Sequence, residues 1–225
     1  MPFLILAILF AAVLYGPQLW VNWVLRRHGR ERPDLPGTGG EFARHLLDRL
    51  GLREVQVETT EEGDHYDPRS RRVRLLPQHH DGRSLTAVVI AAHEVGHALQ
   101  HAQGYAPLLA RQRLVELAGH AQRIGSGILI AAPFLAVLAR APAPGLLVAA
   151  AGLLTLGAGA LVHLVTLPVE LDASFRRALP ILEAGYLRGR DLKAAHSILR
   201  AAAMTYAAGA LASLLNVWRW LRAGR

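Results

Sequence analysis

The chain has 225 residues and no cysteine, which excludes disulfide bonds and thiolate metal sites. Hydrophobic residues make up 52% of the composition, and they are bunched in long runs, as is typical of membrane proteins. The formal net charge is +8, but the arginines flank the apolar runs and form no basic stripe with interleaved aromatic residues. We therefore expect no nucleic-acid partner.

The first apolar run predicts a transmembrane anchor over residues 1–25. Pro2 to Leu25 contains no charged residue, and a helix of this length can cross the hydrocarbon core of a bilayer. Because no Lys or Arg precedes the run, an uncleaved anchor is favoured over a cleavable signal peptide. The positive charges that follow it predict that the chain continues in the cytoplasm. They are Arg26, Arg27, Arg30 and Arg32.

Residues 26–122 are expected to form a small cytoplasmic α+β unit. Thr38 and the glycines after it predict the start of a helix over Glu41 to Leu50. Two short alternating segments, Arg53 to Thr59 and Arg72 to Leu76, predict strands, and the Asp-Pro step within residues 64–68 predicts a turn between them. Such a sheet offers an edge along which an extended peptide can lie.

The segment His93-Glu94-Val95-Gly96-His97 has the HExxH pattern of zinc hydrolases. It lies in a run that predicts one helix from about Ser84 to Ala102, where residues four apart share a face, so His93 and His97 can direct two imidazoles at one ion. Zinc held in this way leaves a position for water, and Glu94 is placed to accept a proton from that water. The alternative, a solvated helix face, is disfavoured by the apolar residues before the motif.

Two further apolar runs, Ile124 to Ala139 and Ala141 to Val169, are separated by a turn rich in proline, which predicts a transmembrane hairpin over residues 123–169. The hairpin returns the chain to the cytoplasm, where residues 170–200 are expected to form a helical segment with the third zinc ligand. A last apolar run ends near two tryptophans and predicts a C-terminal transmembrane helix over residues 201–225.

A zinc site built on two histidines needs a third protein ligand, and the sequence lacks the longer HExxHxxGxxH motif. Glu170 is the candidate that we favour, because it closes a long apolar run, where a carboxylate is unfavourable unless it is paired. Two alternatives stay open. In the first, Glu170 binds no metal and only marks the water interface. In the second, the third ligand is His101, one turn beyond His97. If His101 is not a ligand, it is a solvated residue or one that orients a ligand.

Four segments resemble the YugP-like neutral zinc metallopeptidases of bacterial membranes, and the resemblance runs over nearly the whole chain. They are Asp64-His65-Tyr66-Asp67-Pro68, Ala92-His93-Glu94-Val95-Gly96-His97-Ala98, Gly104-Tyr105-Ala106-Pro107-Leu108 and Thr166-Leu167-Pro168-Val169-Glu170. Residues 170–174 also resemble the Glu-x-x-Ala-Asp element of more distant relatives, the HtpX-like proteases and CAAX prenyl endopeptidases, in which the glutamate is the third ligand. Ser174 stands where those proteins have aspartate, so Asp172 or Ser174 is expected to support a ligand imidazole.

The expected reaction is hydrolysis of a peptide bond by a water that the metal activates, with Glu94 as the base. One further donor should stabilise the oxyanion, and Tyr206, Arg176 and His65 are the candidates. Each has a plainer alternative role. Tyr206 can bond another helix, Arg176 can meet a headgroup or an acidic side chain, and His65 can stabilise its turn.

Together these features predict a mainly α membrane protein, with about four transmembrane helices and a small cytoplasmic α+β zincin-like unit. We expect a zinc metalloendopeptidase that holds one Zn²⁺ and cleaves peptide or membrane-protein substrates. Its partner is the lipid bilayer, and its active site faces the cytoplasm at the bacterial cytoplasmic membrane. The alternative is a non-catalytic zinc-binding membrane scaffold or regulator. The oligomeric state is left open.

Overall fold

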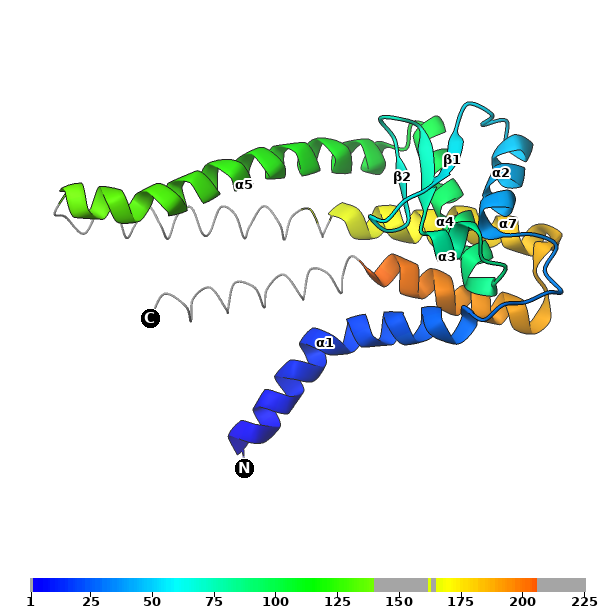
Figure 1. The fold of residues 1–225 in the computed structure, drawn as a ribbon, viewed down its shortest axis with the longest axis horizontal. Helices are drawn as coiled ribbons and strands as arrows, with labels where there is room; N and C mark the ends of the chain where they lie inside the picture. The colour runs from blue at the N-terminus through cyan, green and yellow to red at the C-terminus, as the bar shows by residue number, and fades with distance from the viewer. Residues whose placement is uncertain (1, 140–161, 163–164, 206–225) are drawn as a thin grey trace. The chain divides into compact units, whose positions relative to one another are not determined.

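The computed structural model describes residues 2–139, 162 and 165–205, and it shows a mainly helical protein with one small sheet (Figure 1). The chain forms two compact units. The first combines Met1–Tyr105 with Leu167–Arg225, and the second is Ala106–Thr166. The first unit contains the HExxH segment together with Glu170, whereas the second contains the long helix α5 (Ala106–Ala139).

The start of the first unit follows the local signals of the sequence. Helix α1 (Pro2–His28) is followed by a linker and by α2 (Gly39–Arg49). Thr38 caps α2 with a capping box, because its hydroxyl accepts from the backbone N–H of Glu41 at 3.2 Å while the Glu41 carboxylate accepts from the Thr38 N–H at 2.9 Å. Helix α2 therefore begins where Thr38 predicts.

The sheet has three strands in the order β1-β3-β2: β1 (Gln56–Thr59), β2 (His65–Asp67) and β3 (Arg72–Leu75). β3 pairs in parallel with β1 and antiparallel with β2. The two predicted strands are present, and the Asp67-Pro68 step marks a turn as predicted, but residues 65–67 before it form a further strand, β2, that was not predicted. Asp67 opens the turn, because its carboxylate accepts from the Arg69 N–H at 2.9 Å and from the Ser70 hydroxyl at 2.7 Å.

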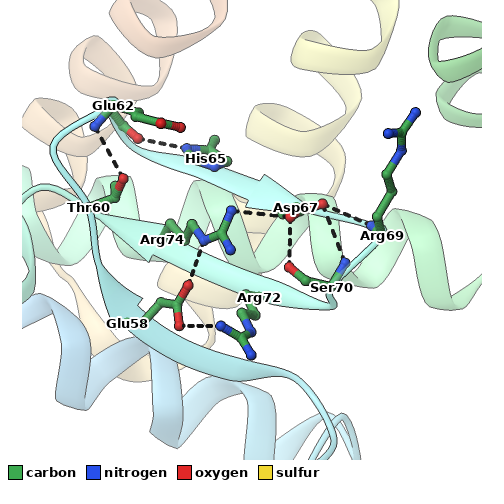
Figure 2. A network of polar contacts seen from close by, with 10 residues as sticks. Glu58, Thr60, Glu62, His65, Asp67, Arg69, Ser70, Arg72 and Arg74 are labelled. Carbon is green, nitrogen blue, oxygen red and sulfur yellow. Dashed lines mark hydrogen bonds and ion pairs between the residues drawn. The ribbon is translucent and has the colours of Figure 1, made fainter. Parts of the chain in front are cut away.

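One face of the sheet is polar and the other is apolar. On the polar face, drawn in Figure 2, Glu58 of β1 accepts from Arg72 at 2.9 Å and from Arg74 at 2.6 Å, and Arg74 also reaches Asp67 of β2 at 3.2 Å. These pairs join all three strands in one register. The side chains that alternate with them, such as Val73, are buried.

The apolar face of the sheet packs on α4 (Leu85–Ala102), the helix of the HExxH motif. A short helix, α3 (Pro77–His80), precedes α4. Ser84 caps the first turn of α4, because its hydroxyl accepts from the Ala87 N–H at 3.1 Å. Helix α4 lies among the sheet and the other helices of the first unit in Figure 1, and it contacts α2, β2, β3 and η1. Nearly all of its residues are buried. Its burial on all sides explains its apolar sequence.

The last part of the first unit is a helical segment with two stretches of π-helix. Its residues 167–171 are α-helical and continue into η1 (Asp172–Ala178), α7 (Leu179–Ile181) and η2 (Leu182–Tyr186). Residues 189–205 form a further helix. The π-helical hydrogen bonding of η1 changes which side chains share a face, and η1 is the part that packs against α4.

The prediction of about four transmembrane helices is wrong for the residues described here. Within this part of the chain, no helix combines the length and the apolar character needed to cross a bilayer. Some apolar residues of α1 pack on protein instead, since Val21 and Val24 are buried and the Leu25 carbonyl accepts from the Thr86 hydroxyl of α4 at 2.9 Å. Residues 140–161 and 206–225, which hold much of the predicted hairpin and C-terminal helix, lie outside the described residues.

Candidate metal centre

Three buried side chains from two distant parts of the chain meet beside α4. The Oε2 atom of Glu170 lies 3.2 Å from Nε2 of His93 and 3.2 Å from Nε2 of His97. The two imidazole rings stand 4.8 Å apart at an interplanar angle of 80°. The helical spacing of the HExxH motif brings the histidines to one face, and the segment before η1 brings the carboxylate to them.

The outer nitrogen of each imidazole has its own acceptor. Nδ1 of His93 lies 3.0 Å from Oγ of Ser174, whose hydroxyl in turn reaches the Leu199 carbonyl at 3.3 Å. Nδ1 of His97 lies 2.9 Å from Oε1 of Gln100. If each Nδ1–H donates outward, both Nε2 atoms direct a lone pair at the Glu170 carboxylate.

This arrangement fits a zinc ion. Two lone pairs and a carboxylate oxygen repel one another unless a cation lies between them, and neutral imidazole with carboxylate is a ligand set that zinc prefers. Ligands about 2.0–2.1 Å from a tetrahedral ion stand roughly 3.3 Å apart, close to the 3.2 Å between each Nε2 and Oε2. His93, His97 and Glu170 all offer a ligand atom within 4.8 Å of one another.

The charge of Glu170 is stabilised in place. Its side chain is 1% exposed, and burial by itself would raise the pKa of the carboxyl. The His97 and His93 rings, when they carry a proton, outweigh burial and hold the pKa of Glu170 below its ordinary value. The group thus favours positive charge at its centre, whether that charge is a proton or a metal ion.

Glu94 follows His93 on α4 and is 5% exposed. His93 directly precedes it and His97 follows three positions later, so a helix places Glu94 about 100° around the axis from His93 and 60° from His97. Glu94 therefore lies on the same turn of α4 as the motif histidines, but it is not a member of the three-residue group. This is the position expected of a base beside a metal-bound site.

Two of the residues expected to support the ligands lie around this group. Ser174 contacts His93 directly, as described above. Asp172 reaches the ligands through Gln100, because its Oδ2 accepts from Gln100 Nε2 at 2.8 Å. The alternative ligand His101 points elsewhere, since its Nδ1 lies 2.9 Å from the Tyr66 hydroxyl of β2. Burial, followed by the charge of Arg71, lowers the pKa of His101.

The three candidates for the oxyanion donor lie apart from the group or outside the described part of the chain. His65 alternates with buried Tyr66 on β2 and lies 2.8 Å from the Gly63 carbonyl through Nδ1 (Figure 2). Arg176 is exposed on η1. Tyr206 is not among the described residues. Their proposed role stays a prediction.

Two residues around this centre were not predicted from the sequence. Gln100 lies three positions after His97 and so shares its helix face, a signal that the spacing contained. Arg177 donates from Nε to Asp172 Oδ2 at 2.6 Å. These two residues are five apart, and only the π-helical path of η1 brings such a pair together, so ordinary helical periodicity could not reveal it.

Comparisons with known proteins agree with this chemistry. The family described as "Putative neutral zinc metallopeptidase" matches residues 3–225. A curated relative, "Putative membrane protease YugP" of Bacillus subtilis (strain 168), is 35% identical over 228 residues, which cover 98% of this chain and 96% of the relative. No solved structure gives a significant match.

The family resemblance and the zinc cofactor predicted from the sequence are thereby confirmed, and His93, His97 and Glu170 form a group that can bind the metal. The chain belongs to the neutral zinc metallopeptidase family.

Proposed function

We propose that this protein is an endopeptidase that hydrolyses peptide bonds with one zinc ion held by His93, His97 and Glu170. The observation that carries the proposal is the meeting of these three buried side chains, from α4 and from the segment before η1. Glu94, the residue after His93 on α4, is buried as well. Family membership supports the hydrolase class, and the geometry supports the assignment of each residue.

The proposed roles follow from the chemistry of each group. Zinc, when bound, supplies a Lewis acid that polarises a peptide carbonyl and lowers the pKa of a water. Glu94 accepts the proton of the attacking water and passes it to the leaving amine. Glu170 contributes a negative charge that compensates the metal, because a cation beside a carboxylate favours its charged form. Ser174 and Gln100 hold the two imidazole rings in place.

An extended polypeptide is the substrate form that the fold supports best. β2 is an edge strand of the sheet, with β3 on one side, and it is joined to α4 by the hydrogen bond between Tyr66 and His101. A peptide that adds to the edge of β2 would run beside the helix that carries the site. Peptide or membrane-protein substrates are therefore proposed, in keeping with the name of the relative.

The test uses the purified full-length chain loaded with zinc and a quenched fluorescent peptide library blocked at both ends. The wild-type protein should cleave internal bonds, lose activity with a chelator and regain it when zinc is restored. Glu94→Gln should retain one zinc per chain and lose about 10²–10⁴-fold in rate, because the amide cannot accept the proton. Exposed Glu183→Gln is the matched control and should cleave normally.

The outcomes separate an enzyme from a scaffold. Full activity of Glu94→Gln would remove Glu94 as the base. A zinc-loaded wild-type protein that cleaves neither blocked peptides nor unfolded proteins would favour the non-catalytic scaffold. Release of terminal residues alone, with blocked peptides left intact, would replace the endopeptidase with an exopeptidase.

We further propose that the protein works at the cytoplasmic face of the bacterial cytoplasmic membrane. Tyr15, Leu19 and Trp23 of α1 are each more than half exposed, and the Arg27 guanidinium lies 5.2 Å from the Trp23 ring centroid. Aromatic side chains beside arginines suit the headgroup region of a membrane. Fractionation of cells tests this: recovery of the full-length chain in the soluble fraction alone would contradict it.

A further inference from the structure

The two candidate zinc histidines are supported by different chemistry. His93 contacts a hydroxyl, Oγ of Ser174, whereas His97 contacts an amide, that of Gln100. Gln100 is 0% exposed and lies on α4 one turn after His97. A glutamine amide can present either its oxygen or its nitrogen to an imidazole, so the effect on His97 depends on which atom faces the ring.

The neighbours of Gln100 determine that orientation. Its second polar atom, Nε2, lies 2.9 Å from the Val169 carbonyl oxygen and 2.8 Å from Oδ2 of Asp172. Both neighbours are acceptors only, so the NH₂ group must occupy this side, with one hydrogen for each acceptor. Oε1 is therefore left to face His97, and it can only accept. His97 must then carry its proton on Nδ1 and present the lone pair of Nε2 to Glu170.

Asp172 is itself held in place. Arg177 donates from Nε to Asp172 Oδ2 at 2.6 Å, and both side chains are nearly buried, with 11% and 8% exposed. Nη1 of the same guanidinium donates to Oε1 of Gln103, and its central carbon, Cζ, lies 5.3 Å from the Tyr105 ring centroid. The pair depends on η1, since π-helical hydrogen bonding places residues five apart near each other.

We propose that Gln100 is the positioning residue for His97: it fixes the Nδ1–H tautomer of His97, and the Asp172–Arg177 ion pair fixes Gln100. The proposal deepens the proposed function, since the lone pair that it fixes is the one offered to zinc. It also assigns to η1 a task beyond packing, because Asp172 and Arg177 meet only through its π-helical path. The tautomer can be measured without any proteolysis.

The test compares Gln100→Met with the wild-type full-length chain. Methionine keeps the shape of the side chain but has neither the oxygen nor the NH₂ group. Long-range ¹H–¹⁵N spectra of histidine-labelled, metal-free protein at alkaline pH, assigned with His93→Gln and His97→Gln, report the tautomer of each ring. In the wild type, His97 should show the Nδ1–H pattern. In Gln100→Met, His97 alone should become a mixture of tautomers, while His93 stays unchanged.

Zinc affinity, measured by competition with a chelating dye, is the second readout. Gln100→Met should bind zinc about 10–100-fold more weakly, as loss of a partner to a metal-binding histidine generally does. Thr86→Val is the matched control, because Thr86 is equally buried on α4 but donates to the Leu25 carbonyl. It should lower thermal stability and leave both the tautomer and the zinc affinity unchanged.

Gln100→Glu guards against a variant that merely folds poorly. It keeps an oxygen that can only accept facing His97, while its second oxygen faces the acceptors Val169 and Asp172, which lowers stability. The folded variant should keep the Nδ1–H tautomer of His97 even though its melting temperature falls. If His97 keeps its tautomer in Gln100→Met, or if folded Gln100→Glu loses it, Gln100 is not the positioning residue. A wild type with the expected tautomer but no zinc binding would instead contradict the proposed function alone.

Discussion

Gly96 of α4 lies directly against the carbonyl oxygen of Ala173 in η1. A Cβ atom added to Gly96 would stand 2.7 Å from that oxygen, closer than real Cβ contacts come. This approach lets η1 lie tightly on the HExxH helix, with Ser174 against His93 and Glu170 against both histidines. Gly96, the third residue between the two histidines of the motif, therefore contributes to the site because it has no side chain.

Gly96→Ala should weaken zinc binding and the fold together. Alanine favours a helix by about 0.5–1 kcal/mol over glycine, but the clash here is with backbone and overpacking costs about 1–3 kcal/mol, so destabilisation should win. Thermal unfolding and zinc titration measure the two effects. Gly119→Ala on α5 is the control, because nothing lies within 4 Å of its Cβ position. A Gly96→Ala protein with unchanged zinc affinity would show that the close contact does not position Glu170.

Glu170→Gln should abolish tight zinc binding while the protein still folds. Loss of a supporting partner already weakens metal binding about 10–100-fold, so loss of the ligand charge should weaken it further. In the metal-free state the new amide can donate to the two imidazole nitrogens that the carboxylate faced, so the variant should still show a cooperative unfolding transition. Elemental analysis and unfolding curves decide this. One zinc per chain at wild-type affinity would remove Glu170 from the ligand set.

Zinc itself should stabilise the fold, because the site joins α4 to the segment before η1. At a free zinc concentration 100 times the dissociation constant, the gain is about 2.7 kcal/mol. For a chain of this length that corresponds to a rise of roughly 5–10 °C in melting temperature. Calorimetry with zinc and then with chelator measures the difference. Magnesium, which prefers oxygen ligands, serves as the control ion and should leave the melting temperature unchanged.

Ser174→Ala should weaken zinc binding through His93. The substitution leaves the Nδ1–H of His93 and the Leu199 carbonyl without the hydroxyl that joins them. We expect zinc affinity to fall about 10-fold or more, with the His97 ring unaffected. Ser126→Ala, at an exposed position of α5, is the control. Equal zinc affinity in the two variants would mean that Ser174 serves packing only.

Acidification should destabilise the protein through His101. Burial, and then the charge of Arg71, lowers the pKa of His101 below its ordinary value of 6.5, so the folded state binds fewer protons than the unfolded state. This contribution is present above pH 6.5 and is lost as the pH falls below that value. Burial raises the pKa of Tyr66 to about 12, so its hydroxyl stays protonated and can donate to the neutral ring.

The wild-type melting temperature should therefore fall between about pH 7.5 and pH 5.5, and it should fall less in His101→Gln. The slope should not vanish, because the pKa of His28 is also lowered, by burial and by Arg27. An identical pH dependence in the two proteins would show that His101 does not titrate as described. The comparison uses metal-free protein, so that zinc release does not add to the slope.

The chemistry of α4 could be predicted from sequence because it depends on local spacing. A helix turns once in about 3.6 residues, so two histidines four apart must share a face wherever the helix lies. The caps at Thr38 and Ser84 are local in the same way, since each hydroxyl meets a backbone N–H three residues ahead. Glu170 could be predicted as a ligand only because an unpaired carboxylate at the end of an apolar run is unfavourable.

Apolar residues of α1 could not be assigned to lipid or to protein from sequence. A valine such as Val21 or Val24 is stabilised by leaving water, and lipid and protein both provide an apolar surface. Composition therefore cannot tell which of them covers it. The structure shows that these two side chains are buried in the core of the first unit.

By itself, the sequence determined the spacing of the two HExxH histidines, the place of Glu94 between them and the resemblance to the family, because each depends only on which residues stand at which positions along the chain. Only the tertiary structure decided that Glu170 reaches His93 across 77 positions, that η1 is π-helical, and that Gln100, Asp172 and Arg177 support His97. The physical reason is that these contacts join segments far apart in the chain, and packing determines how closely such segments approach. Here α4 and η1 approach closely because Gly96 has no side chain. Local periodicity carries no information about that approach.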